Sequence, residues 1–135
     1  MSDDVLIEFS NDDMLRGKIV EPAWYEMEIT DVVSKISSKG DSTNYVVTSR
    51  VVKNSDDGSD KFAGVPVTWN FNSKAKGFMV GYFNALGIEV GAGRPFNLGA
   101  TVGERLDVYV EPGEYENKVR NQVNHKYRMR RDLVA

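Results

Sequence analysis

The stretch SKAKGFMVGYFNALG, residues 73 to 87, decides the fold class because a helical pattern interrupts a chain that otherwise alternates. Its apolar residues follow the i, i+3, i+4, i+7, i+8 spacing of an amphipathic helix: Ala75, Phe78, Met79, Tyr82, Phe83 and Leu86. Ser73 is expected to cap the start of this helix, and Gly87 to end it. We therefore expect one helix with a buried apolar face.

Alternating apolar and polar residues predict strands on both sides of this helix. Three strands are expected before it, in residues 24–33, 44–52 and 64–72. Two follow it, in residues 105–111 and from residue 118 onward, joined by a turn at Pro112 and Gly113. The side chains expected to face the core are Tyr25, Met27, Ile29, Val33, Tyr45, Val47, Val51, Val65, Val67, Trp69, Phe71, Leu106, Val108 and Val110.

The order of three strands, one helix and two strands is that of the OB fold. We therefore expect a mainly β protein, a five-stranded OB-fold barrel with one α-helix between strands 3 and 4. A four-stranded antiparallel sheet packed against a helix is the alternative. The expected parts are an acidic N-terminal arm in residues 1–20, the OB-fold domain in residues 21–128, and a short basic C-terminal tail in residues 129–135.

Composition narrows the class of protein. A length of 135 residues suits one domain, and the absence of cysteine excludes disulfides and thiolate metal sites. The N-terminal region is acidic and lacks the apolar run of a signal peptide, and no window has the apolar length of a membrane helix. We expect a cytoplasmic protein that contacts no membrane and needs no cofactor.

Charge is divided unevenly along the chain. Residues 1–60 hold 13 acidic and 6 basic side chains, a net charge of -7, whereas residues 61–135 have a net charge of +4. Much of the basic surplus lies in the last expected strand, where alternation places these polar residues on one side: Lys118, Arg120, Gln122, Asn124, Lys126 and Arg128. Asn121 falls on the apolar side, which predicts a bulge or a structural hydrogen bond.

Three short motifs carry a resemblance to a known family. They are Ala85-Leu86-Gly87 at the end of the helix, Gly103-Glu104 before a strand, and Asn121-Gln122-Val123 followed by Tyr127. In these motifs and their order, residues 20–128 resemble small single-stranded DNA-binding proteins encoded by bacteriophages. The resemblance implies an OB fold that coats single-stranded DNA during phage replication or recombination, in the cytoplasm of the infected bacterium. Further partners to expect are phage or host replication proteins and a second copy of the chain.

One feature departs from that family. Many single-stranded DNA-binding proteins end in an acidic tail that recruits partners, but this chain ends MRRDLVA and carries its acidic segment at residues 1–13. We expect residues 1–20 either to pack on the domain through Val5, Leu6, Ile7 and Phe9, or to compete with DNA for the basic strand.

Binding to single strands requires cations for phosphates and flat side chains for bases. The candidate nucleic-acid-binding residues are Lys39, Arg50, Trp69, Tyr109, Lys118, Arg120, Asn124, Lys126 and Arg128. Trp69 shares a face with Val67 and Phe71, so burial in the core is its alternative role. For Lys39 and Arg50 the alternative is a cation that is merely solvated.

Enzymatic sites are not favoured by the sequence. One histidine and no cysteine leave no zinc cluster and no Cys-His pair. The glycine-rich segment 87–99 lacks the Gly-Lys-Ser/Thr ending of a phosphate loop. We expect no catalytic residue and no metal site. The rival functions are a protein-interaction module and, with the Asp pairs at 12–13 and 56–57, a metal-dependent nuclease.

Overall fold

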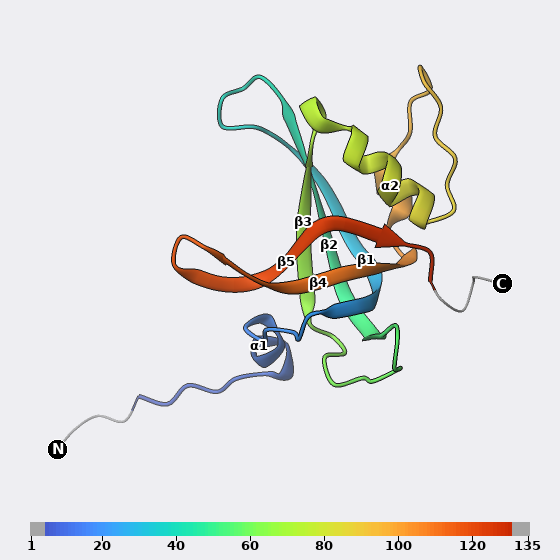
Figure 1. Cartoon of the computed structure of the whole chain (residues 1–135). Helices are drawn as coiled ribbons and strands as arrows, with labels where there is room; N and C mark the ends of the chain where they lie inside the picture. Colours follow the sequence, from blue (N-terminus) through green and yellow to red (C-terminus); the bar gives the residue numbers. More distant parts are fainter. Residues whose placement is uncertain (1–4, 131–135) are drawn as a thin grey trace.

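The computed structural model describes residues 5–130 and, of Tyr115, the backbone alone (Figure 1). Of the expected tail only residues 129 and 130 fall within this range, and the first four residues of the expected arm lie outside it. The elements in chain order are α1 (Asn11–Arg16), β1 (Ala23–Ile36), β2 (Thr43–Asn54), β3 (Pro66–Asn72), the 3-10 turn η1 (Ser73–Ala75), α2 (Gly77–Ala85), the 3-10 turn η2 (Leu98–Thr101), β4 (Arg105–Tyr115) and β5 (Lys118–Arg128).

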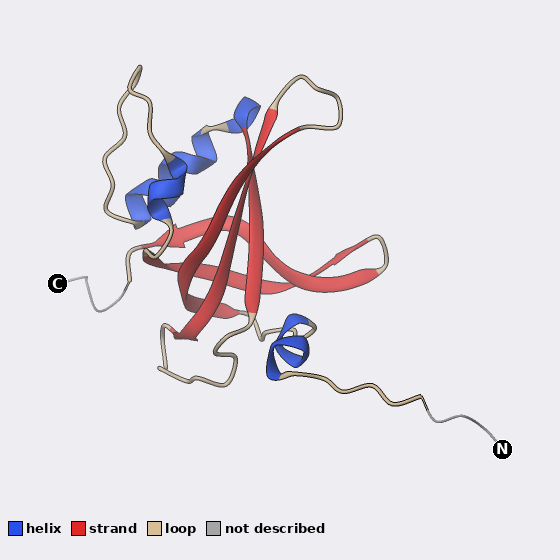
Figure 2. Ribbon diagram, turned by 180° about the vertical axis from the view of Figure 1, so that it is seen from behind, coloured by secondary structure: helices blue, strands red, loops and turns tan. Residues whose placement is uncertain are grey.

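The strands form one antiparallel sheet of five strands in the order β3-β2-β1-β4-β5. β1 pairs with β2 along most of its length and with β4 only through its first part, from Ala23 to Glu28. Figure 2 shows the β4–β5 hairpin crossing the other three strands, with α2 near one end of the sheet and α1 near the other. A mainly β fold with a helix between the third and fourth strands is thereby confirmed. Within the described residues no ladder joins β3 to β5, so hydrogen bonds do not close the sheet into a barrel.

The core lies on the inner face of this curved sheet, as alternation predicts. The residues expected to face inward that are buried are Tyr25, Met27, Ile29, Val47, Val51, Val65, Val67, Trp69, Phe71, Leu106, Val108 and Val110. Tyr45 is half-buried, and Val33 is 39% exposed. The prediction for Val33 is wrong because β1 has no β4 neighbour beyond Glu28 and continues with β2 as a two-stranded ribbon.

α2 is shorter than its sequence pattern predicts. Ser73 does not cap it, because the α-helix begins at Gly77 after η1, and the Ser73 hydroxyl instead accepts a hydrogen bond of 2.9 Å from the Thr43 amide. Tyr82 and Phe83 are buried as expected, but Phe78 is 55% exposed, which corrects its assignment to the core.

The end of α2 is as predicted. Gly87 has a left-handed φ of 74°, and the amides of Gly87 and Ile88 donate to the carbonyls of Asn84 and Phe83 at 3.0 and 2.9 Å. These two bonds form the Schellman arrangement that glycine permits after a helix.

The turn between β4 and β5 lies at Glu116 and Asn117, not at Pro112 and Gly113. Both turn residues have left-handed φ values, 52° and 65°, as a two-residue hairpin of type I′ requires. Pro112 and Gly113 pair with β5 inside the ladder. β4 has lost its β1 neighbour at this point, so the sheet edge tolerates a proline. The longer strands extend beyond the sheet as a ribbon that carries Lys118 (Figure 1).

The N-terminal arm is anchored near its end rather than through its first residues. Ser10 and Asp13 form a capping box at the start of α1, and the buried Val20 donates its amide to the Asn121 side chain at 2.9 Å. Asn121 also donates to the Lys18 carbonyl at 3.0 Å, so the structural hydrogen bond expected at Asn121 is confirmed. Packing through the early apolar residues is wrong, because these are exposed: Val5, Leu6, Ile7 and Phe9.

Candidate nucleic-acid interface

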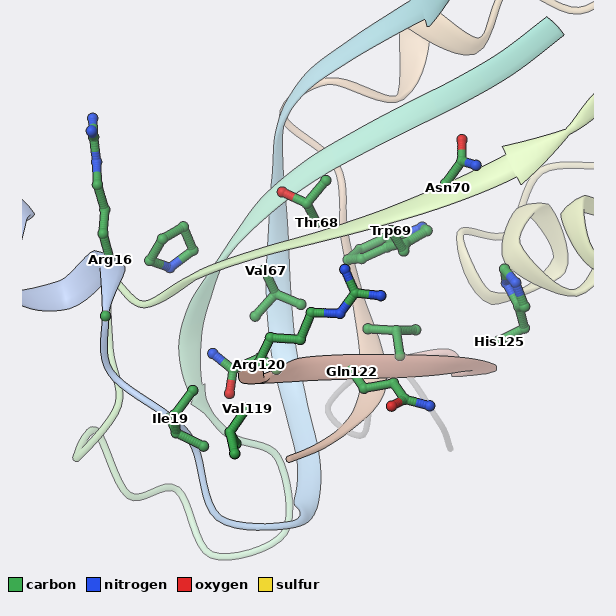
Figure 3. Close-up of a pocket in the computed structure, with 14 residues that line it drawn as sticks. Arg16, Ile19, Val67, Thr68, Trp69, Asn70, Val119, Arg120, Gln122 and His125 are labelled. Carbon is green, nitrogen blue, oxygen red and sulfur yellow. The ribbon is translucent and has the colours of Figure 1, made fainter. Parts of the chain in front are cut away.

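A groove of about 510 Å³ separates the two edge strands of the sheet. Its walls are residues 66–70 of β3 and residues 119–123 of β5 with His125, and the end of α1 and the segment after it contribute Arg16, Gly17 and Ile19 (Figure 3). The groove exists because β1 pairs with both β2 and β4, which brings the outer strands of the curved sheet face to face. The two edge strands, two aromatic side chains (Trp69 and His125) and two arginines (Arg16 and Arg120) line this groove.

Aromatic contacts hold one end of the groove together. The ring centroids of Trp69 on β3 and Tyr127 on β5 lie 6.0 Å apart, and those of Phe71 and His125 lie 5.3 Å apart. Figure 3 shows the Arg120 side chain reaching from β5 toward β3, on the side where Val67 and Trp69 line the groove. An exposed cation therefore lines the groove.

Trp69 is a core residue that also lines the groove. Its side chain is only 4% exposed and its ring packs edge-on against Tyr82, so it is a core residue. It also forms part of the groove floor, and its indole nitrogen has no hydrogen-bond partner within the described residues. Its buried ring offers no open face on which a base could stack.

The basic residues of β5 do not share one surface, so the prediction of a single ladder of donors is wrong. Arg120 lines the groove, whereas the Lys126 ammonium lies 5.1 Å from the Tyr109 ring centroid, and the Arg128 guanidinium lies 4.3 Å from that of Trp24. The β4–β5 register is irregular between Val108 and Val110, and in this stretch of β5 His125 takes a left-handed φ of 55°. Such a bulge bends the strand and increases its twist, so the residues before and after it have different neighbours.

Arg128 is held by carboxylates. Its guanidinium lies 3.1 Å from Asp107, which is buried on β4, and 2.9 Å from Asp56 in the loop after β2. Ser55 donates a hydrogen bond to the same Asp107 oxygen. Arg128 therefore neutralises buried negative charge in the free protein.

The remaining predicted residues lie outside the groove. Arg50 on β2 pairs with Glu28 at 2.8 Å, and hydrogen bonds from Arg105 and then Arg50 lower the pKa of Glu28. Lys39 is exposed in the loop between β1 and β2. The Asn124 amide donates to Glu111 at 2.6 Å.

Tyr109 is half-buried on β4. It meets the Trp24 ring edge-on, with 5.7 Å between the centroids. Of the predicted residues, the groove therefore collects Trp69 and Arg120, and Lys118 lies two residues away on the same ribbon.

Sequence reasoning missed His125 and Phe78 as site residues. Their rings are stacked, with centroids 4.6 Å apart and planes at 20°. Burial lowers the pKa of His125, which favours the neutral imidazole. The sequence contained one signal for this pair, a single histidine within a basic strand, but it gave no means of matching that histidine to the helix.

Within residues 5–130, no three His, Asp or Glu side chains are placed to hold a metal ion together. None of the helices in that range has the length and apolar character needed to cross a bilayer. Against known proteins, no family model and no curated sequence matches this chain.

Proposed function

We propose that this chain is an OB-fold protein that binds single-stranded DNA with little sequence preference. The strand order, the antiparallel pairing of β1 with both β2 and β4, and the helix between β3 and β4 support the OB assignment. In a closed OB barrel the third and fifth strands are neighbours. Here β3 and β5 face each other across the groove, and their ring contacts span the gap.

The observation that carries the proposal is the Arg120 side chain in the wall of a groove that Trp69 and His125 also line. Single-stranded nucleic acid binds where cations follow the backbone and apolar surface receives the bases. Arg120 supplies charge in the groove wall, Arg16 lies at the edge of the groove, and Asn70 and Gln122 supply amides for sugars and base edges. Lys118 extends the positive charge along the ribbon.

Low sequence preference follows from the groups available. Cations and ring faces interact with any nucleotide, whereas reading a sequence requires several fixed donors and acceptors matched to base edges. Bound protein would then keep single strands from reannealing and from nucleases by mass action. This suits phage replication or recombination in the cytoplasm of an infected bacterium, which is the role the sequence resemblance implies.

Replacing Lys118 and Arg120 by alanine should weaken oligo-dT binding and flatten its salt dependence. Each lost phosphate contact on a single strand lowers the magnitude of the slope of log K against log salt by about 0.7, so the double variant should lose about 1.4. Adding Lys126→Ala should bring the total decrease in the magnitude of this slope to about 2, provided that the same DNA strand contacts Lys126 beside Tyr109. Fluorescence titrations at four salt concentrations measure these slopes.

The matched control for this series is Lys53→Ala, which removes an exposed lysine from β2, away from the groove. It should leave both affinity and slope unchanged. All variants should keep the parental melting temperature, because exposed substitutions usually shift stability by about 0.5 kcal/mol or less. A double variant with parental affinity and slope would remove the groove cations from the binding site.

A protein-interaction module is the second candidate, and the apolar residues 5–9 favour it. Four large apolar side chains stand exposed there ahead of α1, beside Glu8: Val5, Leu6, Ile7 and Phe9. Such a segment suits capture by a partner's groove. Measuring the DNA affinity of a chain that lacks residues 1–9 distinguishes two roles for this segment. Unchanged affinity leaves the segment available to a protein partner, and tighter binding at low salt means that the acidic arm competes with DNA.

A further inference from the structure

Phe78 presents an aromatic ring to solvent in the first turn of α2. Its side chain is 55% exposed, although its spacing along the helix is that of a core residue. One side of the ring is fixed by the His125 imidazole, with 4.6 Å between centroids and an interplanar angle of 20°. A near-parallel stack of this kind leaves the opposite side of the Phe78 ring available.

The imidazole behind Phe78 is itself held in place. His125 Nδ1 lies 2.9 Å from the Tyr127 hydroxyl, and the imidazole centroid lies 5.3 Å from that of the buried Phe71. The left-handed backbone at His125 is unfavourable for a residue other than glycine, so the surrounding contacts must maintain it. Phe71, His125 and Phe78 therefore form three consecutive rings that lead from the core to the surface.

This series of rings is continuous with the groove. His125 lines the groove wall together with Asn70 and Gln122 (Figure 3). The Phe78 ring is stacked on the His125 imidazole. A strand that leaves the groove past His125 would meet the open side of the Phe78 ring. Other aromatic rings are less available for stacking, because Trp69 is buried and cations lie over the rings of Tyr109 and Trp24.

We propose that Phe78, supported by His125, is a platform on which a nucleobase of single-stranded DNA stacks at the α2 end of the groove. This inference rests on the proposed function. It adds a base-binding position on the helix to a groove whose cations bind phosphate. The chemistry is that of ring faces, so any base can occupy the position.

The test compares Phe78→Leu with Phe78→Trp in oligo-dT titrations of the full chain. Leucine keeps an apolar side chain on α2 but removes the flat ring, and it should weaken binding about tenfold, within the range for loss of one base stack. Phe78→Trp keeps a flat ring, so it should bind oligo-dT at least as tightly as the parental chain does. The slope of log K against log salt should stay at its parental value in both variants, because no phosphate contact is lost.

Phe96→Leu is the matched control. Phe96 is also a partly exposed phenylalanine, at 42%, but it packs against Phe83 in the loop after α2 and does not line the groove. It should bind oligo-dT as the parent does. Photo-crosslinking of a 5-iodouracil oligonucleotide, followed by peptide mapping, should place an adduct on Phe78 or His125.

The outcomes separate the two proposals. Parental affinity in Phe78→Leu, with no adduct at either residue, would overturn the platform and leave single-stranded DNA binding in place. A changed salt slope in Phe78→Leu would also overturn it, because the substitution would then act on the phosphate contacts. No binding of oligo-dT by the parental chain would overturn the proposed function, and the platform with it.

Discussion

Replacement of Arg128 by methionine is expected to lower the free energy of unfolding by about 3 kcal/mol. The Asp107 side chain is 1% exposed, and Arg128 is the cation that contacts it, at 3.1 Å. Removing one partner of a buried pair leaves an uncompensated charge, which costs about 3–5 kcal/mol. The lower end of this range applies because the Arg128 side chain is 34% exposed. Urea denaturation measures the change.

A second variant tests the cause of this loss. Adding Asp107→Asn removes the buried charge, so the double variant should be less destabilised than Arg128→Met alone. Lys74→Met is the matched control, because Lys74 pairs with Asp41 at 2.6 Å while both side chains remain largely exposed. Exposed pairs contribute about 1 kcal/mol or less. Equal losses in the single and double variants would show that packing of Arg128 on Trp24, rather than charge, is what matters.

Truncation of Phe83 to alanine should cost about 3–5 kcal/mol of stability, because it leaves a cavity in the core. The Phe83 side chain is 6% exposed and packs against Phe96, with 4.7 Å between ring centroids. Phe78→Ala, five residues earlier on the same helix, should cost far less because that ring is largely in solvent. Thermal melts of the two variants provide the comparison. Similar losses would contradict the division of α2 into a buried and an exposed aromatic.

Much of the fold could be predicted because its determinants are local. Alternation of apolar residues identified the inner face of the strands, and a change of period marked the helix between β3 and β4. The predictions fail where neighbouring strands determine whether a side chain is buried or where a turn forms. Val33 alternates correctly but lies where β1 has lost β4, and the hairpin turn formed at Glu116 and Asn117 although Pro112-Gly113 has the stronger turn sequence.

The candidate site was less predictable for the same reason. The concentration of cations in β5 is visible in the sequence, and Arg120 does line the groove. His125, between Arg120 and Lys126, adopts a left-handed conformation. No glycine or asparagine stands at this position to predict it. The capture of Arg128 by Asp107 and Asp56 depends on residues 21 and 72 positions away, which no local pattern can pair.

The separation of cations into two groups has a functional consequence. Arg120 lines the groove and Lys118 lies two residues away on the same ribbon, whereas Lys126 lies over the Tyr109 ring and Arg128 over the Trp24 ring. Because Arg128 already neutralises a buried carboxylate, its contribution to DNA affinity should be small. Any loss of DNA binding on its replacement must be corrected for the accompanying loss of stability.

The central claim is that the groove between β3 and β5 binds single-stranded DNA. Its most direct test is a titration of the full chain with oligo-dT and with duplex DNA of equal length, at low and moderate salt and in the presence of magnesium. We expect the protein to bind oligo-dT more tightly than the duplex and to lose affinity as the salt concentration rises. The oligonucleotide should stay intact in magnesium. Absence of oligo-dT binding at low salt, or equal affinity for the duplex, would contradict it.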